Sequence, residues 1–239
     1  MAVLALVTAS HLNAFQPAAA ETRTDNLDFT IYFGGIRIGT VLMSAEISDT
    51  EFVIEGSITS SGLASALSGF GHASRVRGTI RKDEFRQQSY VSMTKTRKRR
   101  SEAGIVYIGD RPDVRYYRPE REPRDYDLVP SEQKGTLNPT IAAYFMLRNA
   151  THETLCDQTY DIYDGRRRTN LVLEVPEIVD GEATCQAAFK RVAGYSQEEL
   201  DEKSSFETKL VYRRSGDDSF ELWKITADST IGTINMLRN

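Results

Sequence analysis

The sequence predicts a mainly β protein, built on one large antiparallel sheet that curls strongly into a half-barrel or spiral-like barrel. Three observations indicate this fold class. Apolar and polar residues alternate with a period of two along most of the chain, turn residues separate the alternating runs, and only two short segments have clear helical spacing. About a dozen strands are expected, and that many twisted strands seldom remain one flat sheet.

The first strands show the clearest alternation. The run 27–33 alternates regularly and ends at the glycine pair 34–35, which is typical of a hairpin turn. The run 36–47 follows at once and is rich in β-branched and apolar residues. A second turn precedes the alternating run 52–59. Three strands joined by short turns predict an antiparallel meander.

The same pattern returns along the rest of the chain. Further strands are expected at 73–80, 85–96, 104–108, 114–117, 158–163, 170–175, 184–192, 206–213 and 220–227. Hairpin turns account for Gly165 and for the neighbouring Asp217 and Asp218. The acidic stretch 198–202 is expected to form a solvated turn or a short helix.

Two segments, 61–70 and 138–149, break the strand pattern and predict one or two short helices on the concave side of the sheet. The second has a good N-cap followed by proline in its first turn, and its apolar residues share one face. We expect this helix to be buried, either as plain core packing or as a gate over a lipophilic cavity. The cap and gate residues are Asn138, Pro139, Ile141, Phe145 and Met146.

The segment 111–135 contains four prolines and dense charges. Apart from the short strand at 114–117, it is expected to be a long surface loop. Three aromatic residues in it are candidates to contact a partner: Tyr116, Tyr117 and Tyr126. The alternative is that they pin the loop to the sheet.

The first twenty residues contain no Asp, Glu, Lys or Arg, and Ala18, Ala19 and Ala20 are small enough for cleavage before Glu21. Residues 1–20 are therefore expected to be a signal peptide, followed by a single β-rich periplasmic domain over 27–239. No basic residue precedes the apolar core of this leader. Either the true start codon lies upstream, inside a longer signal, or the segment is a flexible apolar tail. No later run is long enough to span a membrane.

Cys156 and Cys185 are the two cysteines of the chain. In an oxidising compartment an even count favours a disulfide, which in the chain-entropy model stabilises by about 3–4 kcal/mol. Two buried free thiols are the alternative. No metal site is expected, since the cysteines lack a CxxC spacing and His72 and His152 are the histidines left after cleavage.

The formal net charge is −4, which gives no reason to expect a nucleic-acid partner. Two basic runs, 95–100 and 166–168, are local exceptions. They lack the interleaved aromatic residues of a base-stacking surface, so we expect solvated strand ends. Binding to an anionic phospholipid or lipopolysaccharide surface is the alternative for both.

Catalytic motifs are missing from the sequence. No GxSxG elbow accompanies a histidine, and no nucleotide-binding glycine loop is present. Ser92 and Lys95 match the SxxK spacing, but they lie in a strand pattern without the companion motifs of penicillin-binding enzymes. We therefore predict no catalytic residues, no cofactor and no enzymatic activity.

Several motifs in the same order resemble a known family. They are Tyr32-Phe33-Gly34-Gly35-Ile36-Arg37-Ile38-Gly39-Thr40, Val129-Pro130 leading to Leu137-Asn138-Pro139, and Tyr163-Asp164-Gly165-Arg166-Arg167 with Cys185 and Val192-Ala193-Gly194-Tyr195 downstream. Over about residues 27–238 the chain resembles the bacterial domain-of-unknown-function family 3108 (DUF3108), especially its alphaproteobacterial members. The resemblance implies a secreted periplasmic protein without established catalytic residues. Asn138 stands where Asp is expected, and both residues cap helices.

We consider three functions, in decreasing order of preference. The first is a non-catalytic factor in the periplasm of a Gram-negative bacterium, which supports envelope integrity by binding an envelope protein or a cell-wall component. The second is a periplasmic carrier of a lipid or another lipophilic ligand, by loose analogy with curled sheets of lipoprotein carriers. The third is an uncharacterised enzyme.

Overall fold

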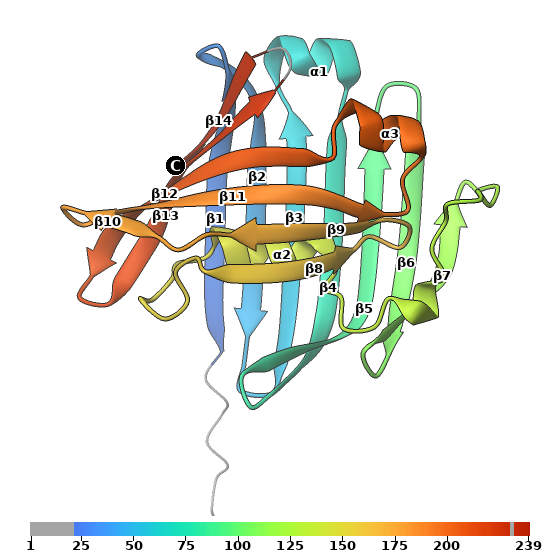
Figure 1. Ribbon diagram of the computed structural model, residues 1–239, viewed down its shortest axis with the longest axis horizontal. Coiled ribbons are helices and arrows are strands. Elements are labelled where there is room, and N and C mark those ends of the chain that lie inside the picture. The colour runs from blue at the N-terminus through green and yellow to red at the C-terminus, as the bar shows by residue number, and fades with distance from the viewer. Residues whose placement is uncertain (1–21, 230–231) are drawn as a thin grey trace, which may run out of the picture.

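The structure, a computed structural model, describes residues 22–229 and 232–239. Its strands form one 14-stranded sheet in which neighbouring strands are antiparallel. The sheet remains open, with β7 and β8 as its two edges, and Figure 1 shows it wrapping around a central helix. The predicted mainly β, curled antiparallel fold is confirmed. The proposed signal peptide, 1–20, lies outside the described residues.

The first half of the sheet is a seven-stranded meander in which each strand pairs with the next in sequence. Its strands are β1 (Arg23–Phe33), β2 (Ile36–Ile47), β3 (Glu51–Ser60), β4 (Gly71–Arg81), β5 (Glu84–Lys95), β6 (Arg100–Ile108) and β7 (Arg111–Arg118). The predicted turn at Gly34 and Gly35 has φ of 55° and 81°, a conformation that glycine adopts without strain.

The second half contains the remaining seven strands. They are β8 (Gln158–Tyr163), β9 (Arg168–Leu173), β10 (Glu177–Val179), β11 (Glu182–Ala193), β12 (Ser205–Gly216), β13 (Ser219–Ser229) and β14 (Gly232–Arg238). The sequence pattern did not predict β10 and β14. Because β14 is short and only partly buried, its alternation is weak.

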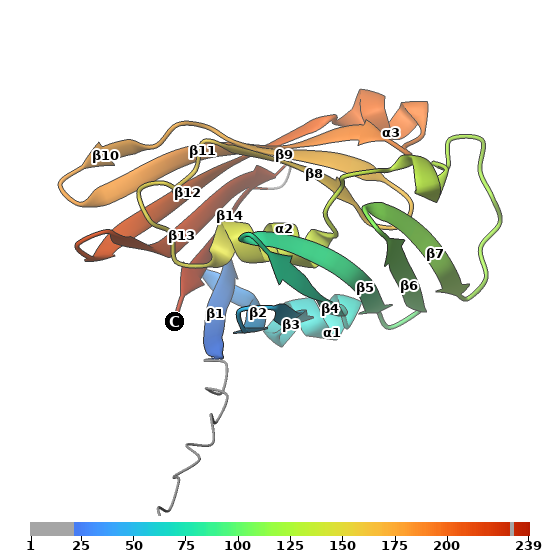
Figure 2. The ribbon, with the colours of Figure 1, turned by 90° about the horizontal axis from the view of Figure 1, so that it is seen from below.

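The two halves are joined by β1 and β14, which pair so that Phe29 lies opposite Arg238. Figure 2 shows the half made of β1–β7 and the half with β8, β9, β11 and β12 as two layers with α2 between them. The strands that pair in the middle of the sheet are thus the first and the last of the described chain.

Helix α2 (Pro139–Leu147) occupies the interior between the two halves, as predicted for the segment 138–149. The Asn138 side chain accepts hydrogen bonds from the backbone N–H groups of Thr140 and Ile141, which confirms the predicted cap. Gln87 of β5 holds this end of the helix, because its Oε1 accepts from both the backbone and the side-chain nitrogen of Asn138. A buried polar network thus fixes α2 to the sheet.

The other helices are short and lie outside the interior. They are α1 (Gly62–Ser68), the 3-10 turn η1 (Pro130–Glu132) and α3 (Gln197–Glu202). The sequence predicted α1, and for α3 a short helix was one of two alternatives beside a solvated turn. Neither has a buried residue, so α2 is the helix that packs on the concave side.

The hydrophobic core lies where α2 meets the inward faces of both layers. Phe52, Ile54 and Val76 contribute from the first layer, and Leu171 and Leu210 from the second. All five side chains are almost fully removed from water, which is the main stabilising contribution expected for such a fold. Tyr212 of the second layer also donates a hydrogen bond to Met146 of α2 at 2.8 Å.

The segment 111–135 differs in part from the predicted surface loop. Its first eight residues form the edge strand β7, Arg111–Arg118, which is longer than the short strand expected at 114–117. Pro112 is tolerated there because an edge strand leaves one side of the backbone unpaired. The irregular part therefore begins only after Arg118.

Candidate functional site

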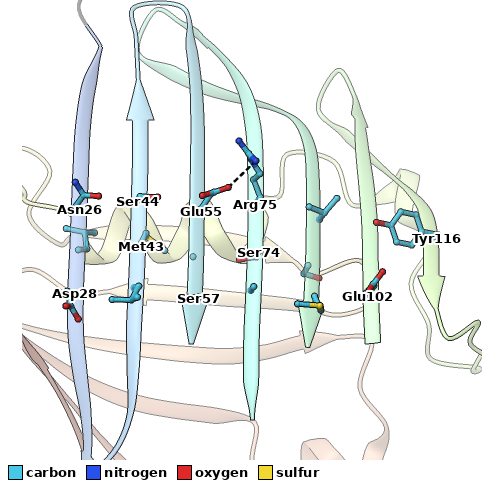
Figure 3. Close-up of a pocket in the computed structure, with 17 residues that line it drawn as sticks. Asn26, Asp28, Met43, Ser44, Glu55, Ser57, Ser74, Arg75, Glu102 and Tyr116 are labelled. Atoms are coloured by element: carbon cyan, nitrogen blue, oxygen red, sulfur yellow. Dashed lines mark ion pairs between the residues drawn. The ribbon is translucent and has the colours of Figure 1, made fainter. Parts of the chain in front are cut away.

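A groove of about 820 Å³ lies on the face of β1–β7 that points away from α2. Figure 3 views the strands from this side, with α2 behind them. Side chains that alternate with the core residues of the same strands line the groove, so the core and the groove are the two faces of one sheet layer. The volume is within the range of about 300–1,000 Å³ typical of ligand sites.

The strand register arranges the outward side chains of the groove in two rows across the sheet. The first row is Asn26, Ser44, Glu55, Arg75, Val91, Gly104 and Tyr116, each opposite the next on the neighbouring strand. The second row is Asp28, Leu42, Ser57, Ala73, Met93 and Glu102. Residues far apart in sequence therefore form one continuous surface.

Small residues in the middle of the rows make the surface hollow. Ser57 and Ala73 lie side by side in the second row, between the larger Leu42 and Met93. In the first row Gly104 leaves room for the Tyr116 ring, which a Cβ at this position would overlap. The exposed Leu42 and Val91 supply apolar surface, so the groove has an apolar floor that is open to solvent.

Charged groups surround this floor. Arg75 lies 3.2 Å from Glu55 in an exposed ion pair, and Arg100 pairs with Glu102 at 2.9 Å. Asp28 accepts a hydrogen bond from the Asn239 side chain at 2.7 Å. Exposed pairs of this kind stabilise little, so they are available to reorganise around a charged ligand.

Among the described residues that line the groove, the ionisable side chains are those of Asp28, Glu55, Arg75, Glu102 and Tyr116. No histidine or cysteine is among the described residues that line it, so Ser57 and Ser44 have no neighbouring imidazole that would act as base. In the part of the chain that the structure describes, no three His, Cys, Asp or Glu residues gather closely enough to hold a metal ion.

The predicted gate residues lie on the other side of the sheet layer. Ile141 is fully buried, and the Phe145 ring packs against Phe85 and Tyr160 with centroids 5.2 and 5.7 Å apart. Pro139 and Met146 line a smaller, partly open pocket of about 200 Å³. This volume is below the usual range for ligand sites, and α2 does not border the outer groove.

The three tyrosines proposed as loop contacts have different positions. Tyr116 lines the groove. Tyr117 donates a hydrogen bond to the carbonyl oxygen of Gly165 in the β8–β9 turn. The Tyr126 hydroxyl accepts a hydrogen bond from Arg124 at 2.8 Å, and the Arg166 guanidinium lies 5.8 Å from the ring centroid. Tyr117 and Tyr126 therefore connect the loop to the second layer.

Tyr117 belongs to a group of side chains that joins the two open edges of the sheet, which we call the edge cluster: Tyr117, Arg121, Asp127, Tyr163 and Arg166. Asp127 accepts a hydrogen bond from Arg121 at 2.5 Å and forms an ion pair with Arg166 at 3.4 Å. Tyr163 donates to the same Gly165 oxygen as Tyr117. These contacts hold the β7 edge against the β8–β9 turn without a backbone ladder.

Electrostatics in the edge cluster favour the charged form of Asp127. Partial burial opposes ionisation, but the Arg124 backbone N–H and the guanidinium groups of Arg121 and Arg166 outweigh it and lower the Asp127 pKa. Burial raises the pKa of the Tyr117 hydroxyl, which stays a hydrogen-bond donor.

The basic run 166–168 is not the solvated strand end that the sequence suggested. Arg166 pairs with Asp127, Arg167 with Glu199 of α3, and Arg168 with Asp161. Hydrogen bonds from the Ser196 backbone and the charge of Arg167 lower the Glu199 pKa. The prediction failed because all three acidic partners come from other segments.

The predicted disulfide between Cys156 and Cys185 is present, with Cα atoms 6.3 Å apart. Both cysteines are buried. The bond links the segment before β8 to β11, so it fixes the second layer internally. It lies apart from the groove.

Comparison with known proteins gives a family without an assigned activity. The model of the family described as protein of unknown function (DUF3108) matches residues 28–187. The chain belongs to this family. The DUF3108 match covers the second half of β1, all of β2–β10, most of the groove lining, α2 and both cysteines. No curated protein and no solved structure matches the chain.

The groove was missed in the sequence because its rows exist only once the strands are in register. Outward positions of an alternating strand are usually solvated and polar. Leu42, Ala73, Val91 and Met93 break this rule at outward positions, which is the one sequence signal that could have indicated a second apolar surface. Among the predicted site residues, Tyr116 is the one that lines it.

Proposed function

We propose that the protein is a non-catalytic binding protein of the Gram-negative periplasm, which supports envelope integrity by holding an extended, apolar segment of an envelope protein in the outer groove. The observation that carries the proposal is the pair of cross-strand rows, in which Ser57 and Ala73 leave an open groove beside exposed Leu42 and Val91. An extended peptide crossing the strands has the shape of this groove.

The chemistry of the groove also suggests which segment would bind. Its apolar floor suits Leu, Val or Met side chains. Asp28 and Glu102 at the two ends of the second row favour a segment that carries basic residues beside the apolar ones. The disulfide supports the periplasmic address, because such bonds persist in oxidising compartments. The motifs shared with alphaproteobacterial members support the same source and address.

A lipid carrier is the second candidate, since an acyl chain could lie along the same apolar floor. The interior of the protein supports a lipid carrier less well than it supports partner binding. The pocket beside Met146 is partly open and measures only about 200 Å³, whereas carriers enclose most of a ligand's surface. Partner binding through the open face is therefore the function that the geometry supports best.

The test uses photocrosslinking in the periplasm of the native host. A benzophenone amino acid replaces Leu42 or Val91 in the groove, and Val192, which is equally exposed on β11, serves as control. We expect a discrete crosslinked envelope protein from the two groove positions and none from position 192. The crosslink should disappear when Ala73→Trp fills the groove and persist with Val192→Trp.

A strain that lacks the protein links the crosslink to envelope integrity. It should be sensitive to detergent, and the Ala73→Trp gene should fail to restore resistance while the Val192→Trp gene succeeds. Organic extraction of the purified protein tests the carrier. Stoichiometric lipid that Ala73→Trp removes, without any groove-specific crosslink, would overturn partner binding in favour of lipid carrying.

A further inference from the structure

Helix α1 lies at one end of the sheet (Figure 1), beside the turn between β5 and β6. Leu63 and Leu67 are four residues apart, so they lie on the same face of the helix. Their exposed fractions are 72% and 74%. Ile36, at the start of β2, is 68% exposed and lies two residues before Ile38, whose oxygen bonds to the Ser61 N–H at the start of α1. Core packing does not explain why the side chains of α1 are apolar, because α1 has no buried residue.

Backbone hydrogen bonds connect this apolar surface to its neighbours. The Ser61 N–H donates to the Ile38 oxygen at 2.8 Å, which holds α1 beside β2. The Arg97 N–H donates to the Ser68 oxygen at 2.9 Å, which holds the β5–β6 turn against the C-terminal end of α1. The leucines and the basic turn thus form one connected surface.

The β5–β6 turn gives this surface its charge. Lys95, Arg97, Lys98 and Arg99 are all exposed, and within the described residues none of them forms an ion pair. The segment 56–82, which contains α1, and the turn segment 95–101 contain no Asp or Glu, and Glu102, the first carboxylate after the turn, pairs with Arg100 at 2.9 Å. The acidic helix α3 lies in the other layer, as Figure 2 shows. The local field at the α1 end is therefore positive.

We propose that the α1 end, defined as Ile36, Leu63 and Leu67 with Lys95, Arg97, Lys98 and Arg99, docks on the surface of a bilayer that contains anionic lipid. Exposed leucines on a short helix insert at the boundary between headgroups and acyl chains, and basic residues beside them attract anionic headgroups. The charge of the turn selects this occupant over a neutral apolar partner. The inference does not depend on what the groove binds.

The expected strength of membrane binding follows from the number of basic residues at the α1 end. Each Lys or Arg held close to an anionic membrane surface strengthens binding by about fivefold, and the attraction falls off within about 10 Å at moderate salt. Four basic residues and two inserted leucines are therefore enough for reversible docking. Binding should weaken steeply as salt is raised.

The experiment measures co-sedimentation of the purified mature protein with vesicles. We expect binding to vesicles of phosphatidylethanolamine and phosphatidylglycerol and no binding to vesicles of phosphatidylcholine alone. Leu63→Ser with Leu67→Ser, and separately Lys98→Glu with Arg99→Glu, should each reduce binding at least tenfold. Both pairs are exposed and outside the core, so folding should be unchanged.

Two control variants remove the same chemistry elsewhere. Val175→Ser with Val179→Ser removes two exposed apolar side chains near β10, and Lys190→Glu with Lys209→Glu reverses two exposed charges on β11 and β12. Both should bind anionic vesicles like the parent protein. Equal loss in the control and α1-end variants would overturn the site, and so would equal binding to both kinds of vesicle or to neither.

A fluorescence measurement locates the contact. The chain has a single tryptophan, Trp223 on β13. The guanidinium carbon of Arg213, on β12, lies 3.9 Å from the centroid of its ring. In a Trp223→Phe background, Leu67→Trp should shift its emission to the blue on anionic vesicles, and brominated lipids should quench it. An unshifted, unquenched tryptophan on bound protein would contradict insertion of α1.

Discussion

The two basic runs of this protein look alike in sequence and differ completely in the folded molecule. Residues 95–100 protrude into solvent in the β5–β6 turn, and among them Arg100 alone has an ion-pair partner in the described chain. Residues 166–168 are half-buried, and each has a carboxylate partner from another segment. The first run forms an external surface, whereas the second holds the fold together.

The structural role of a run of basic residues therefore depends on which segments the topology places beside it. The β8–β9 turn lies at an open edge of the sheet, where the loop after β7 and helix α3 supply Asp127 and Glu199. The β5–β6 turn lies beside α1, where the segments 56–82 and 95–101 contain no acidic residue, and the nearby Glu102 already pairs with Arg100. Similar sequences therefore hold the fold together in one place and form an exposed, positively charged surface in the other.

The largest effect is expected from removing the central carboxylate of the edge cluster. Asp127→Ala leaves the side chains of Arg121 and Arg166, which are only 21% and 18% exposed, without their partner. The free energy of unfolding should fall by about 1–3 kcal/mol. Urea unfolding followed by circular dichroism measures this change.

The matched control is Asp113→Ala on β7, whose partner Arg115 is well exposed. This substitution should alter the free energy of unfolding by less than about 0.5 kcal/mol. If both variants lose the same stability, the edge cluster has no special role.

A smaller loss is expected from Tyr117→Phe, which removes one hydrogen bond to Gly165 and keeps the ring. The free energy of unfolding should fall by about 0.5–1.5 kcal/mol. Tyr116→Phe is the control, because the Tyr116 hydroxyl makes no hydrogen bond within the described chain. Urea unfolding of both variants measures this difference. If the free energy of unfolding of Tyr117→Phe equals that of the parent, β7 is held by its strand pairing alone.

Acid should weaken the edge cluster less than truncation, because a protonated carboxyl keeps some of its hydrogen bonds. The pKa values of Asp127 and Glu199 are lowered from ordinary values of 3.8 and 4.5 in the folded state. Their contribution to stability is complete above these ordinary values and is lost as the pH falls through the lowered ones. Urea unfolding across this acid range should show that the free energy of unfolding falls more steeply with decreasing pH for the parent than for Asp127→Asn.

The smallest effect is expected for the exposed run. Lys98→Glu with Arg99→Glu should leave the free energy of unfolding within about 0.5 kcal/mol of the parent, although the same variant should lose vesicle binding. Thermal unfolding at low salt checks the stability. A loss as large as that of Asp127→Ala would show that the two basic runs are not different in kind.

Local patterns in the sequence were sufficient for the fold class and for the central helix. Period-two alternation located most strands, and Asn138 followed by Pro139 located the start of α2. The cysteine count gave the disulfide. These features depend on residues that are close in sequence or on a single pairing.

Features that depend on register or on distant partners could not be predicted. The groove needs Ser57 beside Ala73 on neighbouring strands, and the edge cluster needs Asp127 beside Arg166. The segment around β14 also escaped prediction, since β14 is identified as a strand by its pairing with β1 and β13 more than by its own alternation.

The pairing of β1 with β14 has a consequence for how the chain folds. Phe29 to Phe33 reach a complete hydrogen-bonded environment only when residues about two hundred positions later pair with them. Contacts so distant in sequence form slowly, because a long loop must close first. The β2–β7 meander and the disulfide-linked second layer are local enough to form independently. Their union should be the late, rate-limiting step, during which the open edge of β1 is the segment most exposed to aggregation.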